Sequence, residues 1–260
     1  QMGAVLIAFE VLSILSILMQ KKKVPVMIWI QLVVTFIAFV LLFMAPGNEM
    51  RVASEITTWM PRYKELSVGN HLFMTIQWML SSFANEGKAF FIAIWTAGFL
   101  LLMKSKKAKV YQILAVVFSV VALLSFFSEM GIGYIDIEQC LTELPTWQTM
   151  TTQNRIAFFW WIAAVLFTMV LLWKVTGHSV FISMVFLGGI ASEAVLHFSP
   201  TIYASGARVY YLTDLMYLFI ILWMVMHMDS EKKKNLFIAG VVVLGVANFL
   251  SQYSIMLLKL

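Results

Sequence analysis

Eight apolar segments dominate this chain, and each approaches the ~20 residues that an α-helix needs to cross a bilayer. They lie at about 2–19, 24–45, 89–103, 110–128, 156–173, 179–197, 209–228 and 236–258. In lipid only helices and closed barrels satisfy the backbone, and these segments lack the alternation of barrel strands. The sequence therefore predicts an all-α fold, a polytopic transmembrane bundle of about eight spans that forms a single domain over 1–260.

The composition excludes an ordinary soluble domain. Hydrophobic residues make up 62% of the chain and charged residues only 12%, whereas a soluble domain has roughly 25% charged residues. The net charge of +5 does not indicate a nucleic-acid partner, because the lysines occur in small clusters between apolar segments. Cys140 is the only cysteine, so no intrachain disulfide can form.

The lysine clusters predict an orientation in the membrane. Four short basic loops hold 11 of the 18 lysines and arginines: QKKK (20–23), KSKKAK (104–109), KVTGH (174–178) and DSEKKKN (229–235). They alternate with the longer loops 46–88 and 129–153. The positive-inside rule places the lysine-rich loops in the cytoplasm and the long loops outside a cell membrane.

With both ends of the chain predicted outside, and with Gln1 in place of a starting methionine, we expect the C-terminal part of a longer chain. A native outward N-terminus stays open as the alternative.

The first long loop has the pattern of two amphipathic helices. Residues 48–60 carry apolar residues at helical spacing, with Asn48 in the N-cap position, and residues 70–85 carry a second apolar stripe. Both are predicted to lie in the outer interface with the apolar face toward lipid. They either fill gaps over the bundle or roof a lipid-facing cavity.

Acidic side chains inside apolar segments cost about 2.5–3.5 kcal/mol each on insertion scales, so each needs a reason. Glu10, Glu193 and Asp214 are such residues. Glu193 and His197 share one helix face at i and i+4. The candidate catalytic residues are therefore Glu193, His197 and Asp214, predicted to converge on an outer pocket with Arg208 and Tyr210. The structural alternative is that His197 bonds a carbonyl and that Asp214 only neutralises Arg208.

Two arginines at loop–helix junctions, Arg51 and Arg208, are suited to hold a phosphate, because the planar guanidinium presents paired donors. The predicted substrate-binding set is Arg51, Arg208, Asn48 and Tyr210. Arg208 could instead extend to lipid headgroups. Nucleotide-binding, zinc-protease and nucleophile-elbow motifs are absent from the sequence. No cofactor or metal site is predicted, although a divalent metal stays open.

The stretch APGNEMR (45–51) resembles an element, A-P-G-N-x-x-R, of an uncharacterised family of bacterial multispan membrane proteins related to the GT-C glycosyltransferases. Ser199, Pro200 and Arg208 resemble a later element of that family, with looser spacing. The resemblance implies a polyprenyl-phosphate-linked sugar donor used at the outer face. GT-C enzymes usually carry their catalytic acid in the first outer loop, which would lie upstream of Gln1, so the resemblance assigns no catalytic residue here.

The leading hypothesis is an integral membrane glycosyltransferase, or its C-terminal half, for modification of a cell-envelope glycan. Its partners would be a polyprenyl-phosphate lipid, a glycan acceptor and membrane lipids. The alternatives are a flippase or transporter for lipid-linked saccharides and a polysaccharide polymerase.

Overall fold

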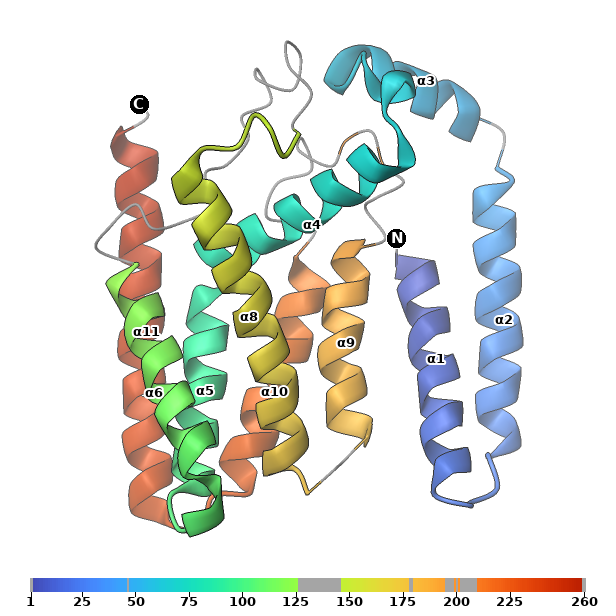
Figure 1. Cartoon of the computed structure of the whole chain (residues 1–260). Helices are drawn as coiled ribbons and strands as arrows, with labels where there is room; N and C mark the ends of the chain where they lie inside the picture. Colours follow the sequence, from blue (N-terminus) through green and yellow to red (C-terminus); the bar gives the residue numbers. More distant parts are fainter. Residues whose placement is uncertain are drawn as a thin grey trace.

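The computed structural model describes residues 2–45, 47–125, 146–177, 180–194, 199, 201 and 210–258. All regular secondary structure in this part of the chain is helical, which confirms the all-α prediction. Most of the helices stand side by side in one bundle (Figure 1). The bundle helices are α1 (Met2–Met19), α2 (Val26–Phe43), α5 (Lys88–Leu102), α6 (Lys109–Leu124), α8 (Thr152–Val175), α9 (Val180–Ala194), α10 (Tyr211–Met226) and α11 (Glu231–Leu258).

Each predicted apolar segment corresponds to one bundle helix. By length and composition, the segments Lys106–Leu124 and Thr152–Val175 can cross a membrane. Five other apolar helices of the described chain are shorter, at Phe9–Met19, Val26–Leu42, Lys88–Leu102, Val180–Ala194 and Tyr211–Met226. A helix is therefore present at each predicted position, while the number of spans is a separate question.

The turns that carry the lysines lie at one end of the bundle. In Figure 1 the connections α1–α2, α5–α6, α8–α9 and α10–α11 are all at the bottom. Two of these turns are joined by charge, because Asp229 pairs with Lys104 and Lys233. The two ammonium groups hold the pKa of Asp229 at about 2, below its ordinary value. The alternation of loops seen in the sequence thus corresponds to two different ends of the structure.

Helix α5 is the centre of the core. Phe91, Ile94, Trp95 and Ala97 are completely buried, and α5 packs against α6, α8, α10 and α11. Its contact with α8 is close because position 98 is glycine, and a Cβ there would lie 2.7 Å from Leu171 Cδ2. Small residues allow this kind of close approach between helices in membrane bundles.

A buried hydrogen bond also links α5 to α8. The indole N–H of Trp95 donates to Thr168 Oγ1 at 2.7 Å, and both residues are fully buried. We expect Thr168→Val to lower the free energy of unfolding by about 1–3 kcal/mol, because it leaves the Trp95 N–H without an acceptor. Reversible unfolding in mixed micelles measures this change.

The matched control is Trp95→Phe combined with Thr168→Val. It should cost less than the sum of the two single substitutions, because the second change removes a donor that has already lost its acceptor. Strict additivity of the two single effects would contradict the importance of this bond.

Helices are present at both positions predicted in the first long loop, as α3 (Asn48–Trp59) and α4 (Val68–Asn85), joined through a short 3-10 turn at Tyr63–Glu65. Helix α3 lies beside the upper end of α2 (Figure 1), and its Met50 and Trp59 are exposed. The predicted cap of α3 is wrong by one residue. Gly47 precedes the helix with φ 103° and its carbonyl accepts from Arg51 N–H, so Asn48 is the first helical residue.

Helix α4 is more deeply enclosed than a helix that only rests on the bundle with its apolar stripe. Helix α4 runs obliquely across the upper end of the bundle (Figure 1), where it packs against α5, α8 and α9. Every residue from Gln77 to Ala84 is buried, so polar side chains such as Gln77, Ser81 and Ser82 are enclosed along with the apolar ones. Ser67 caps the start of α4 by accepting from Asn70 N–H. The helix is thus part of the protein interior.

Candidate functional site

A buried polar cluster lies where α4, α9 and α10 meet. Its central residue is Glu193, in the last turn of α9, with only 1% of its surface exposed. Ser82 on α4 donates to Glu193 Oε2 at 2.9 Å. A buried carboxyl in an apolar bundle is costly unless it is hydrogen-bonded, so this bond explains why α4 carries a serine toward the bundle.

Hydroxyl groups connect α9 to α10 beside this carboxyl. The hydroxyls of Ser192 and Thr213 are 2.8 Å apart, and both residues are buried. Each also reaches the carbonyl oxygen of Gly189, at 2.7 Å from Ser192 and 3.1 Å from Thr213. Thr213 interacts with the Glu193 carboxyl as well. Two helices are therefore held in register around Glu193.

Asp214 belongs to the same region, because its charge acts on the Glu193 carboxyl. It lies in the first turn of α10 and is partly buried. Glu86, at the end of α4, also acts electrostatically on Glu193. Within the described residues, however, no three His, Cys, Asp or Glu side chains are arranged to hold a metal ion. The acidic side chains of this region are near one another but do not form a metal-binding set.

Tyr217 completes the cluster one turn further along α10. Its ring is surrounded by aromatic rings, including Phe91 and Phe186 with centroids 5.5 Å away. A Cβ on Gly189 would lie 3.0 Å from this ring, so the glycine makes room for it. The Tyr217 hydroxyl is buried and has no hydrogen-bond partner among the described residues. A buried hydroxyl without a partner is unfavourable, and such groups in native proteins call for an explanation.

We expect Tyr217→Phe to leave thermal stability unchanged or to raise it, because it removes a hydroxyl that gains no bond in the folded chain. If the hydroxyl serves a bound substrate, the same variant should lose activity at normal stability. Melting temperature and turnover, measured on the same preparation, separate the two effects. A large loss of stability would show that the hydroxyl has a structural partner.

The structure places one further predicted residue, Tyr210, at this end of the bundle, and two others lie outside the described residues. Tyr210 is buried and its ring lies 5.0 Å from that of Trp78 on α4. Tyr210 and Glu193 thus both contact α4, and Asp214 lies one turn after Tyr210 on α10. His197 and Arg208 lie outside the described residues, so the pairing of Arg208 with Asp214 stays a prediction.

Arg51 lies on a different element from this cluster. It is on α3, its side chain is 75% exposed, and its Nε donates to Glu55 Oε1 at 2.7 Å. Glu55 follows Arg51 by four residues, so the two side chains lie one helical turn apart on the same face of α3. Only the backbone of Asn48 is described, as the first residue of α3. The described residues therefore do not bring Arg51 and Asn48 together with Glu193.

Sequence reasoning did not assign Ser82, Thr213 or Tyr217 to the site. Ser82 was visible only as a polar residue beside the apolar stripe of α4, and its bond to Glu193 spans 111 positions. Thr213 and Tyr217 lie on either side of Asp214 in the sequence, and both are on the buried face of α10. Their proximity to Asp214 was the available signal.

The second buried acid, Glu10, has a separate setting. It accepts a hydrogen bond from Thr35 at 2.9 Å and so links α1 to α2. Its other oxygen is buried without a partner among the described residues. Glu10 is a useful comparison for Glu193, because each is a buried carboxyl that accepts from a hydroxyl side chain of a neighbouring helix.

Chemically, the cluster offers a carboxyl and several hydroxyls in a space from which water is excluded. A carboxylate of this kind can accept a proton from a substrate hydroxyl if that hydroxyl comes within hydrogen-bond reach. Comparison of the chain with protein-family models, curated proteins and solved structures gives no match.

Proposed function

We propose that this chain belongs to an integral membrane glycosyltransferase that uses a polyprenyl-phosphate-linked sugar at the outer face of the membrane to modify a cell-surface glycan. Support comes chiefly from the Glu193 carboxyl, which is 1% exposed and bonded to Ser82 across two helices. The Tyr217 hydroxyl, which has no hydrogen-bond partner among the described residues, lies in the same cluster.

In the proposed reaction the acceptor hydroxyl gives its proton to the ionised Glu193 carboxylate. The acceptor oxygen forms a bond to the anomeric carbon of the sugar, while the bond from that carbon to the phosphate oxygen breaks. The electron pair of the broken bond leaves with the polyprenyl phosphate. Ser82, which donates to Oε2, stabilises the ionised carboxylate. Because Glu193 is covered by α4, the acceptor reaches it only if α4 moves.

A transporter for lipid-linked saccharides is the competing proposal, and such proteins typically bind their cargo at broken helices. Helices α5, α8, α9 and α10 are each continuous over their described ranges. This continuity favours the transferase over the transporter.

The transferase is tested directly in proteoliposomes. The purified protein is mixed with polyprenyl-phosphate-linked hexoses and pentoses that carry a radiolabelled sugar, together with a cell-envelope glycan fraction. We expect label to leave the lipid phase and enter the glycan only when protein is present. Label that crosses the bilayer while still attached to lipid would instead identify a transporter and overturn the proposal.

The proposed arrangement in the membrane has eight spans, formed by α1, α2, α5, α6 and α8 to α11, with the lysine-rich turns in the cytoplasm. We expect cysteines at Lys22, Lys107 and Lys232 to be shielded from an impermeant thiol reagent in intact cells. A cysteine at Lys64, in the turn between α3 and α4, should react. Cys140 is replaced in all variants.

Membrane permeabilisation provides the control for this experiment, since it should make the three lysine positions reactive without changing the result at Lys64. All four positions are exposed in the structure, so burial does not account for shielding. Labelling of the lysine turns from outside would invert the proposed orientation and move the carboxyl cluster to the cytoplasmic face.

A further inference from the structure

Lysines gather at the end of the bundle where α6 and α11 begin. The α5–α6 turn and the α10–α11 turn lie next to each other there (Figure 1), and the salt bridges of Asp229 to Lys104 and Lys233 join them. These turns and the first turns of α6 and α11 carry two acidic residues and seven lysines. We call this surface the lysine junction, and its lysines are Lys104, Lys106, Lys107, Lys109, Lys232, Lys233 and Lys234.

Four of these lysines make no ion pair within the described residues. Lys104 and Lys233 pair with Asp229. Lys234 pairs with Glu231. Both acidic residues of the junction are therefore already paired, and the remaining positive charge has no counter-ion in the described chain. The lysines that carry it are all exposed, and they are Lys106, Lys107, Lys109 and Lys232.

The turn that leads into α6 is held in one shape. Lys106–Ala108 forms a 3-10 turn whose last residue is completely buried. The side-chain amide of Gln112 donates to the carbonyl oxygens of Leu102 and Ser105, and these bonds close the turn. An anion that binds here meets ammonium groups on an ordered backbone, so less conformational entropy is lost on binding.

The lysines do not stabilise the helices that they begin. Lys109 is in the first turn of α6, and Lys232 is in the first turn of α11. The N-terminus of a helix is the positive end of its macrodipole, where acidic side chains are stabilising and basic side chains are not. Helix stability therefore does not account for this charge. Orientation in the membrane is one role that does, and the binding of an anion is another.

Exposed apolar side chains continue directly from the lysines along both helices. On α6, Ile113 follows Lys109 by four residues and is 61% exposed. On α11, Leu236 follows Lys232 by four residues and is 69% exposed. Residues four apart share a helix face, so each face has a charged end and an apolar body. A phospholipid with net negative charge matches both parts, whereas a soluble anion matches only the lysines.

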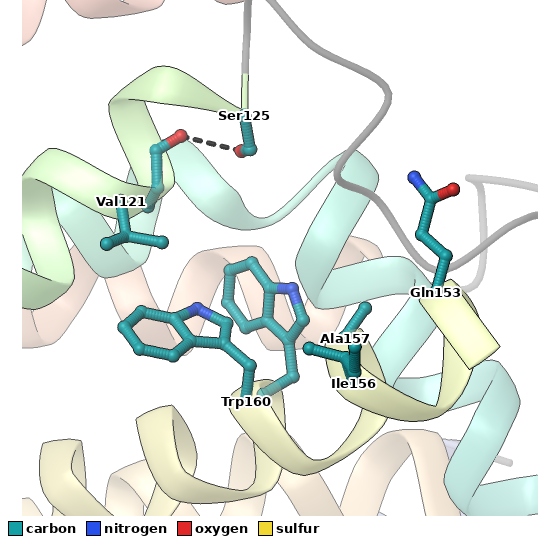
Figure 2. Close-up of a pocket in the computed structure, with 8 residues that line it drawn as sticks. Val121, Ser125, Gln153, Ile156, Ala157 and Trp160 are labelled. Carbon is teal, nitrogen blue, oxygen red and sulfur yellow. Dashed lines mark hydrogen bonds between the residues drawn. The ribbon is translucent and has the colours of Figure 1, made fainter.

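The cavity between α6 and α8 is not part of this surface. Figure 2 shows Val121 and Ser125 on one side of that cavity, near the end of α6, whereas the lysines are at the start of the helix. The cavity has a volume of about 480 Å³, and none of its lining residues is charged. Charge therefore selects the lysine junction, and not this cavity, as the place for an anionic headgroup.

We propose that the lysine junction is a binding surface for anionic phospholipids of the leaflet that meets this end of the bundle. The lipid phosphates lie against the four lysines that have no acidic partner, and the acyl chains cover the apolar faces of α6 and α11. Clusters of about four to eight basic residues next to a membrane span attract anionic lipids in this way. The site depends on the proposed membrane arrangement but not on Glu193 or on the transferase.

The test compares phosphatidylglycerol with phosphatidylcholine of identical acyl chains. Delipidated protein in a neutral detergent is incubated with equal amounts of both lipids, and mass spectrometry counts the lipids that co-elute with the protein. We expect about a tenfold preference for phosphatidylglycerol at low salt. The preference should fall as sodium chloride is raised to about 0.5 M, because salt screens exposed charges. A preference that salt leaves unchanged, or no preference at all, would overturn the proposal.

Neutralisation of three lysines tests the position of the site. The combination of Lys106→Gln, Lys107→Gln and Lys109→Gln should abolish the preference for phosphatidylglycerol. The matched control makes the same change at the three lysines 21–23, which are also exposed and lie in the α1–α2 turn at the same end of the bundle. This control loses the same charge and should keep the preference.

Equal loss of the preference in the two triple variants would show that only the total charge of this end matters, and it would overturn the site. Melting temperatures of both variants show whether each is folded. If the three changes together prevent folding, Lys107→Gln alone should lower retention of phosphatidylglycerol more than Lys22→Gln does. Equal effects of these two single changes would also contradict a site at the lysine junction.

Discussion

Glu193→Gln is expected to lower the rate of sugar transfer by about 10²- to 10⁴-fold, the contribution typical of a general base. In the unchanged chain Ser82 Oγ donates to Glu193 Oε2. Glutamine keeps the shape of the side chain, and its amide oxygen can still accept this hydrogen bond. It cannot take a proton from the acceptor hydroxyl. Turnover of the labelled donor in proteoliposomes, at matched protein content, measures the effect.

Glu10→Gln is the matched control for this variant. Glu10 is also a buried carboxyl bonded to one hydroxyl, Thr35, but it lies between α1 and α2. We expect normal turnover in Glu10→Gln and normal melting temperatures in both variants. Full activity of Glu193→Gln would leave that carboxyl with a structural role and would exclude it as the base.

Asp214→Asn extends the comparison within the cluster. Asp214 acts on Glu193 through its charge, so its neutralisation should change turnover less than the loss of the Glu193 carboxylate itself. The reverse order would exchange the two roles and make Asp214 the base.

Gly98→Leu is expected to prevent the bundle from folding, and Gly98→Ala to cost about 1–3 kcal/mol, the usual range for overpacking a core. A Cβ at this position would lie 2.7 Å from Leu171 Cδ2 and 3.0 Å from Leu171 Cγ. Leu171 is completely buried, so its side chain has little room to move away. Yield of monodisperse protein and the unfolding midpoint in mixed micelles report the outcome.

The same substitutions at Gly240 control for the effect of replacing glycine within a helix. Gly240 is on α11, and a Cβ there would meet nothing within 4 Å. Gly240→Ala and Gly240→Leu should therefore leave yield and midpoint unchanged. Combining Gly98→Ala with Leu171→Ala should recover part of the loss. Tolerance of Gly98→Leu would mean that α5 and α8 are not closely packed at this level.

Segment length and hydropathy were enough to predict where the bundle helices lie. The predicted segment 179–197, for example, contains α9 (Val180–Ala194), because an apolar stretch in lipid has few alternatives to a helix. Helices were also found at both positions predicted in the first long loop, since helical spacing is a local property. Both successes depend on residues that are near one another in the chain.

The depth of α4 could not be predicted in this way. Its sequence shows an apolar stripe with Ser81 and Ser82 beside it, which is the pattern of a helix on a surface. The polar side chains of α4 can be buried because residues of other helices form hydrogen bonds with them. The partner of Ser82, for example, is Glu193 on α9. A periodic pattern reports which side of a helix is apolar, but it does not report which distant residue can satisfy the other side.

The candidate site was predicted in part for the same reason. Glu193, Asp214 and Tyr210 were found because ionisable and aromatic residues are conspicuous near the end of an apolar segment. Arg51 was predicted to hold a phosphate from its position at a loop–helix junction; the structure shows it paired with Glu55 at i and i+4, and its binding role stays a prediction. The hydroxyl partners of the carboxyl were missed because serine and threonine are unremarkable in a membrane helix.

The insertion of α4 between helices that come later in the chain sets the order in which this protein is built. Helix α4 packs against α8 and α9, which are synthesised only after it has left the ribosome. In the proposed membrane arrangement individual spans enter the bilayer before they associate, so we expect α4 to remain unpacked until both are in place. Glu193 is then buried without its Ser82 partner until α4 docks, and the proposed reaction site is completed in the last stage of assembly.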